Sequence, residues 1–189
     1  MPYSRRRYQD KWALERRAAV IRRHLGLLQT DMLDPWLLAD ETPAHVFYLE
    51  ELVEPALAQR ARLIQWDGFA FRFPGEGHLM VLLNPARSLT RQCATLLEEL
   101  SHHLLGHSPS RLYTDPVTGL LRREYNRAQE DEAYDLGSTL LLPKELIQLH
   151  IRDRGASAEE VADTCGCSVE YVHFRIKRCR LWRRYMAAS

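Results

Sequence analysis

Three side chains on one predicted helix have the types and spacing of a metal-dependent hydrolase. Residues 95–107 have the sequence T-L-L-E-E-L-S-H-H-L-L-G-H. On a helix, Glu98 and His102 are i and i+4, so both project from one face and could hold one metal ion. In the zinc-peptidase motif H-E-x-x-H, two His bind the metal and the Glu activates water. This segment has that motif with the first His replaced by Glu98, and Glu99 takes the place of the water-activating residue.

The same side chains are also compatible with structural roles. Glu98 and Glu99 could be solvated residues of an exposed helix face, because adjacent acidic residues on helices are common. Arg91 and Arg127 could then neutralise them, and His102 could be a histidine of the core. A metal site therefore requires a further ligand from a second helix.

Other potential ligands are interpreted as structural. His103 and His107 are also i and i+4, but no Glu lies between them in the position of the base, and we predict that His107 is structural. The four cysteines include one C-x-C pair and no C-x-x-C pair, so reduced and mostly buried thiols are expected. They are Cys93, Cys165, Cys167 and Cys179.

A small antiparallel sheet is expected before the E-E-x-x-H helix. Segments 45–49, 65–73 and 78–83 are rich in aromatic and branched residues, and the turn-forming sequence P-G-E-G at 74–77 separates the last two. This pattern predicts strands with one clear hairpin. Residues 108–122 contain a turn signal at 115–119 and predict a second hairpin.

Helices account for most of the rest of the chain. Apolar spacing, capping residues and Pro or Gly at the ends predict them. They span 11–28, which is basic and amphipathic, a short segment from Asp34 and Pro35, 88–106, and about 125–142. The fold class is therefore α+β.

Charge is unevenly distributed along the chain. The formal net charge is +1. Residues 1–26 have eight basic and two acidic side chains, whereas residues 27–143 have nine basic and seventeen acidic ones. Residues 144–189 are basic again, with nine basic and six acidic side chains. The basic ends could bind a polyanion, or they could pack against the acidic middle through charge.

The C-terminal segment has the spacing of a helix-turn-helix. One predicted helix ends at Gly166, and Ser168 caps the next. The second helix continues into basic residues with no acidic residue between them, as a DNA-contacting surface requires. The candidate DNA-binding residues are Arg175, Lys177, Arg178, Arg180 and Arg183. Such helix pairs also occur as plain packing units.

The order of these segments resembles the ImmA/IrrE metallo-endopeptidase family. Its second helix typically has the pattern E-x-E-A-N-x-F-A-x-x-L-L-M-P, and residues 130–143 here are E-D-E-A-Y-D-L-G-S-T-L-L-L-P. The similarity covers about residues 27–180. The sequence departs from the family at Glu98, at Tyr134 and at the Leu-Gly pair 136–137, and we assign it to a variant subgroup with E-E-x-x-H.

The resemblance implies a zincin-like core with a C-terminal helix-turn-helix-like segment. We place the peptidase-like domain with its basic N-terminal helix at 1–150 and the C-terminal segment at 151–189. Glu130 would be the third metal ligand beside Glu98 and His102, and Glu99 the general base. The implied reaction is hydrolysis of a peptide bond in a protein substrate, often a DNA-binding repressor, in stress or mobile-element regulation. The alternative is an inactive peptidase-fold module that binds DNA or a protein partner.

The ligand set bears on the identity of the divalent metal ion. The family resemblance indicates zinc. Two carboxylates and one imidazole form a harder, more anionic set than two imidazoles and one carboxylate, which shifts the preference toward manganese or iron(II). The additional anionic ligand should also lower the pKa of a bound water less than in an ordinary zinc peptidase.

The sequence offers no sign of a membrane or secretory segment. The longest stretch without charged residues, 100–110, is far shorter than the roughly 20 apolar residues of a membrane span. The N-terminus has no apolar segment of a signal peptide. A cytoplasmic location is expected, and the sequence does not define the oligomeric state.

Overall fold

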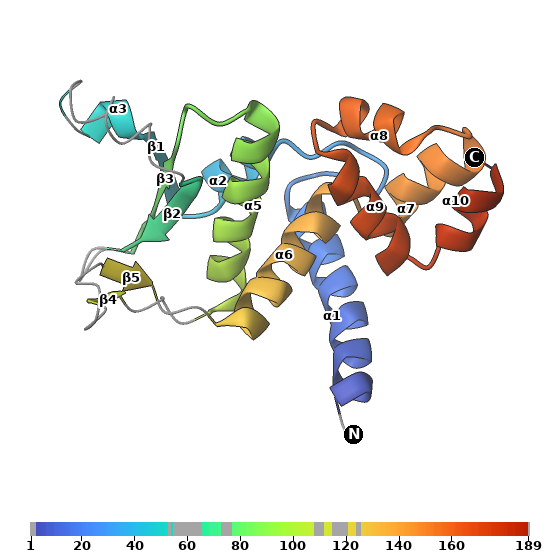
Figure 1. Cartoon of the computed structure of the whole chain (residues 1–189), viewed down its shortest axis with the longest axis horizontal. Coiled ribbons are helices and arrows are strands. Elements are labelled where there is room, and N and C mark those ends of the chain that lie inside the picture. Colours follow the sequence, from blue (N-terminus) through green and yellow to red (C-terminus); the bar gives the residue numbers. More distant parts are fainter. Residues whose placement is uncertain are drawn as a thin grey trace.

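A computed structural model describes residues 3–52, 54, 66–72, 77–107, 112–114, 121–123 and 126–188. The helices are α1 (Tyr3–His24), α2 (Pro35–Glu41), α3 (Leu49–Leu52), α5 (Leu89–Leu105), α6 (Arg127–Leu141), α7 (Lys144–Ile147), the π-helix η1 (Gln148–Asp153), α8 (Ala158–Cys165), α9 (Val169–Arg178) and α10 (Trp182–Ala188). The strands are β1 (Ala44–Tyr48), β2 (Gly68–Phe71), β3 (Leu79–Leu83), β4 (Leu112–Thr114) and β5 (Leu121–Arg123). Figure 1 shows α5 and α6 in the middle of the molecule, between the strands and helices α7–α10. The α+β class is confirmed.

The three-stranded sheet has the order β1-β3-β2, with the buried strand β3 in the centre. The β2–β3 hairpin is antiparallel as predicted, with Ala70 opposite Val81, while residues 73–76 of its turn lie outside the described part. A purely antiparallel sheet was the wrong expectation for β1, which pairs parallel to β3 with Val46 opposite Val81. Parallel pairing is possible because more than a dozen residues connect β1 to the hairpin.

The predicted second hairpin is also present. Strands β4 and β5 pair antiparallel, with Tyr113 opposite Arg122. The turn signal at 115–119 lies outside the described residues.

Helix α5 begins and ends at the predicted signals, and α6 ends before the predicted Pro143. Ser88 caps α5 by accepting a hydrogen bond from the Arg91 backbone N–H, and Gly106 ends the helix in the left-handed region at φ 70°. Helix α6 is capped by the Asn126 side chain and is followed by Pro143. At Gly137, a Cβ would lie 3.3 Å from the Leu97 carbonyl oxygen, so a small residue lets α6 approach α5 closely.

Two arginines of the basic N-terminal helix bind helix C-termini. Arg22 is fully buried in α1, and its guanidinium donates to the carbonyl oxygens of Leu140 at 2.6 Å, Leu28 at 2.8 Å and Asp31 at 2.6 Å. Arg17 donates to the carbonyl of Leu104 in the last turn of α5. The last carbonyls of a helix lack intrahelical partners and carry the negative end of its dipole, so these cations stabilise them.

One hydrophobic cluster connects the N-terminal helix with the C-terminal segment. It extends from Leu14 on α1 through Leu97 and Leu136 to Ile176 and Leu181. The division of the chain at residue 150 stays a prediction. In the part of the chain that the structure describes, no helix has the length and apolar character needed to span a membrane.

Candidate metal centre

The predicted ligands from two helices converge at one point. Glu98 and His102 lie one turn apart on α5, and Glu130 lies in the first turn of α6. Their ligand atoms all lie within 4.8 Å of one another, and among the described residues no other group of three His, Cys, Asp or Glu side chains does so. The His102 Nε2 and Glu130 Oε2 atoms are 3.3 Å apart. The two side chains are 15% and 14% exposed, so the centre is sheltered but reachable from solvent.

A second contact holds the other nitrogen of His102. The Nδ1 atoms of His102 and His107 are 3.0 Å apart, and the two rings meet edge to face. On its far side, His107 Nε2 lies 3.2 Å from Glu132 Oε2. His103 turns elsewhere and contacts Arg72. Burial, with Arg72 nearby, lowers the pKa of His103 and favours its neutral form.

Two arginines at the start of α5, Arg87 and Arg91, share one acidic partner. Arg91 donates to Asp67 at 2.6 Å, and Arg87 pairs with the same carboxylate at 2.9 Å. The two arginines hold the pKa of Asp67 below its usual range, Arg91 contributing most. Asp67 also raises the pKa of Arg91, with a smaller contribution from Glu98. Both Arg87 and Arg91 thus pair with Asp67.

A comparison with protein families identifies the unit that contains this centre. The family model of the IrrE N-terminal-like domain, a peptidase family, matches residues 55–177. The chain belongs to the IrrE N-terminal-like family. No curated protein and no solved structure matches.

The ligand cluster lies within the range that matches the IrrE N-terminal-like family. The matched range contains both helices, the three converging ligands and Glu99. The fold is that of a metallopeptidase, the family is metal-dependent, and the triad is a candidate metal site. The resemblance to ImmA/IrrE proteins predicted from the sequence is confirmed.

Glu99 is buried on the same helix as two of the ligands. Its exposed fraction is 8%, against half-buried Glu98. Burial of a carboxylate is costly unless polar groups or a cation compensate it, so a solvated helix face does not describe this residue.

The half-buried thiols and Tyr134 pack rather than bind metal. No disulfide joins the four cysteines, and burial raises the pKa of the Cys167 thiol to about 12, which favours its protonated form. The Tyr134 ring meets Tyr171 and Phe174 of α9 edge to face. Burial, with the nearby charge of Glu98, raises the pKa of Tyr134.

The candidate DNA-binding residues fall into two groups. The prediction for Arg175 is wrong because this side chain is 1% exposed; it pairs with Glu15 at 2.8 Å and donates to the Leu142 carbonyl. Arg178 is half-buried and bonds to Asp135 on α6. The other three, Lys177, Arg180 and Arg183, are exposed.

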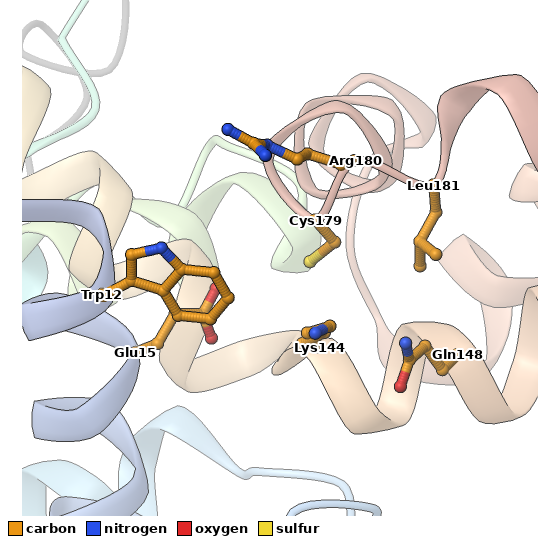
Figure 2. A pocket seen from close by; sticks show the side chains of 7 residues that line it. All are labelled: Trp12, Glu15, Lys144, Gln148, Cys179, Arg180 and Leu181. Carbon is orange, nitrogen blue, oxygen red and sulfur yellow. The ribbon is translucent and has the colours of Figure 1, made fainter. Parts of the chain in front are cut away.

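A pocket of about 310 Å³ lies away from the metal ligands. Figure 2 shows Trp12 and Glu15 of α1 facing Lys144 and Gln148, with the α9–α10 link closing the pocket. The Lys144 ammonium lies 5.5 Å from the centre of the Trp12 ring. Neither the ligand triad nor Glu99 lines this pocket, so the convergence of ligand atoms, not the cavity, locates the candidate site.

Proposed function

We propose that this chain is a divalent-metal-dependent endopeptidase that hydrolyses a peptide bond in a protein substrate. The observation that carries the proposal is the convergence of Glu98, His102 and Glu130 from two helices inside a peptidase-family domain, with buried Glu99 next to Glu98 in the sequence of α5. Three protein ligands leave a coordination position for water or substrate, as in catalytic rather than structural metal sites.

The residues present fit a divalent cation. Three partly buried groups, two of them carboxylates, have ligand atoms within 4.8 Å of one another, and close carboxylates repel unless a cation or a proton offsets them. Glu130 gains some compensation from the N-terminus of α6, where the helix dipole is positive. The harder donor set favours manganese or iron(II) more than the usual two-His set does, although zinc follows from the family resemblance.

The chain's own residues supply binding and proton transfer. Glu98, His102 and Glu130 would hold the cation, which would supply Lewis-acid activation of the water and of the peptide carbonyl. Glu99 takes the proton from the attacking water and returns it to the leaving amine.

The family resemblance supports a proposal for the substrate, and the cysteines support one for the location. We propose a protein substrate, in particular a DNA-binding repressor, and action in the cytoplasm in stress or mobile-element regulation. The four cysteines form no disulfide, which agrees with a reducing compartment.

Elemental analysis of the tag-free protein after dialysis tests the metal site. We expect about one equivalent of a divalent transition metal per chain, because three ligands lie close enough to share one ion. Glu130→Ala should lose that metal, whereas Asp131→Asn, which removes the same charge one residue away, should retain it. A wild-type protein free of metal after metal-replete expression would contradict the proposal and favour the non-catalytic module.

Replacing Glu98 by His tests the role of the unusual ligand. Glu98→His restores two imidazoles and one carboxylate, so the ratio of zinc to manganese affinity should rise by about tenfold or more. Competitive titration with both metals measures this ratio. An unchanged ratio would show that Glu98 is not a ligand.

DNA binding is a second candidate function. Lys177, Arg180 and Arg183 are exposed near the end of α9 and in the segment that follows it. Their positions support contact with phosphates by a regulatory module, with or without peptidase activity.

The salt dependence of duplex binding tests this second function. Changing Lys177, Arg180 and Arg183 to Gln should reduce the slope of log K against log salt by about 0.9 for each phosphate that the protein no longer neutralises. Arg154→Gln, at an exposed position outside α9, is the matched control and should leave the slope unchanged. Absence of binding at low salt would exclude this function for the isolated protein.

A further inference from the structure

The end of α5 places a second histidine against the metal-ligand candidate. Gly106 adopts φ 70° and turns the chain back, and the backbone N–H of His107 then donates to the His102 carbonyl at 3.0 Å. The Gly106 N–H donates to the His103 carbonyl, which completes a Schellman motif. This motif usually brings two apolar side chains together. Here it brings together the imidazoles of His102 and His107.

The imidazoles of His102 and His107 belong to a continuous chain of side-chain contacts. His102 presents Nε2 to Glu130 at 3.3 Å and Nδ1 to His107 at 3.0 Å. His107 presents its remaining nitrogen to Glu132 at 3.2 Å. His107 is 8% exposed on its side chain and Glu132 is 45% exposed, so the line leads from the candidate metal centre to the surface.

The chemistry of each group sets the direction of these hydrogen bonds. A carboxylate only accepts, so His107 donates from Nε2 to Glu132. A neutral imidazole has one N–H, so Nδ1 of His107 accepts and Nδ1 of His102 donates. The lone pair of His102 is then on Nε2, the atom that lies beside Glu130 within the ligand cluster. Because the Glu130 carboxylate also only accepts, two acceptors at this distance are favourable when they share a bound cation.

We propose that His107 and Glu132 are positioning residues that fix the tautomer and ring orientation of His102, so that Nε2 is its metal-binding atom. This inference rests on the proposed metal-dependent function and identifies residues that act through a ligand rather than as ligands. Partners of this kind typically change metal affinity by about 10- to 100-fold when they are removed. Helix α5 thus supplies two ligands and, through its terminal turn, the group that orients one of them.

Two substitutions of His107 separate positioning from folding. His107→Leu removes the acceptor, while its apolar side chain suits this position of a Schellman motif, so thermal stability should be kept. We expect zinc affinity to fall about 10-fold or more. His107→Asn keeps an acceptor close to the position of Nδ1 and should recover part of that loss. Glu132→Leu should weaken binding in the same direction, with Asp131→Asn as the charge-matched control.

Nitrogen-15 NMR of the full chain provides a readout that a merely structural role would not move. In the zinc-loaded protein we expect a scalar coupling between the two Nδ1 nuclei across their hydrogen bond, and chemical shifts that show protonated Nδ1 in His102 and protonated Nε2 in His107. His107→Leu should abolish the coupling. Wild-type zinc affinity in His107→Leu, or the opposite tautomers, would overturn the proposal.

The same experiment distinguishes failure of the inference from failure of the proposed function. If the wild-type chain binds neither zinc nor manganese in titration, the metal-dependent function fails. The scalar coupling between the two Nδ1 nuclei, measured in the metal-free chain, then tests whether His102 and His107 are hydrogen-bonded. Its presence supports the contact between the rings, and its absence overturns the inference independently of metal binding.

Discussion

Replacing Glu99 by Gln should lower peptide-bond hydrolysis by about 10²- to 10⁴-fold or more, the range over which a positioned general base accelerates reactions. Glutamine preserves the size and much of the polarity of this buried side chain but cannot accept and return a proton. Because Glu99 is not one of the three converging ligands, the variant should keep its metal. Cleavage of a peptide library, followed by mass spectrometry, together with metal content, measures both quantities.

Each outcome of the Glu99 experiment assigns a different role to the carboxylate. Glu159→Gln changes an exposed acid on α8 and should leave both activity and metal content at wild-type values. Unchanged cleavage in Glu99→Gln would assign proton transfer to another group. Loss of metal together with activity would show that Glu99 holds the ion, which contradicts its role as base.

Local signals in the sequence were sufficient to predict the central helices. Ser88 and Gly106 bound α5, and Gly166 and Ser168 separate α8 from α9, because these residues stabilise helix ends by their own backbone and side-chain bonds. The direction of β1 was not predictable in this way. Parallel or antiparallel pairing with β3 depends on the path of a long connection, which no local pattern specifies.

The candidate metal centre required more than spacing. The i, i+4 relation placed Glu98 and His102 on one face of α5, but only the family resemblance indicated that Glu130 would join them. The contact of His107 with His102 was missed, although Gly106 is a sequence signal for it. A glycine that ends a helix brings the following residue back over the last turn.

The helical period of α9 explains why the prediction that Arg175 contacts DNA was wrong. Positions 171, 172, 175, 176 and 179 follow the helical period of the buried face of α9, and an arginine in that series belongs to the interior. The prediction of DNA contact rested on the run of basic residues and did not take this period into account. Exposed Lys177 lies off that face, which is why it stays a candidate for DNA contact.

Replacing Arg22 by Met should destabilise the fold by about 3 kcal/mol, because one buried and two partly buried hydrogen bonds from its charged guanidinium to carbonyl oxygens are lost. The side chain is fully buried and bonds to three carbonyls from the end of α6 and the loop that follows α1. Methionine fills a similar volume without a hydrogen-bond donor. For a chain of this size, a loss of about 3 kcal/mol corresponds to a fall in Tm of about 6–12 °C.

The neighbouring arginine provides the control that isolates burial from charge. Arg23 is exposed in the same helical turn, and Arg23→Met should change the free energy of unfolding by less than about 0.5 kcal/mol. Arg22→Lys keeps the charge but lacks the planar fork that reaches several acceptors, so its stability should lie between those of Arg22→Met and wild type. Urea unfolding of the variants measures the differences. Equal effects of the Arg22→Met and Arg23→Met substitutions would show that the charge of the N-terminal helix, rather than the hydrogen bonds of Arg22 to these carbonyls, anchors α1 to α6.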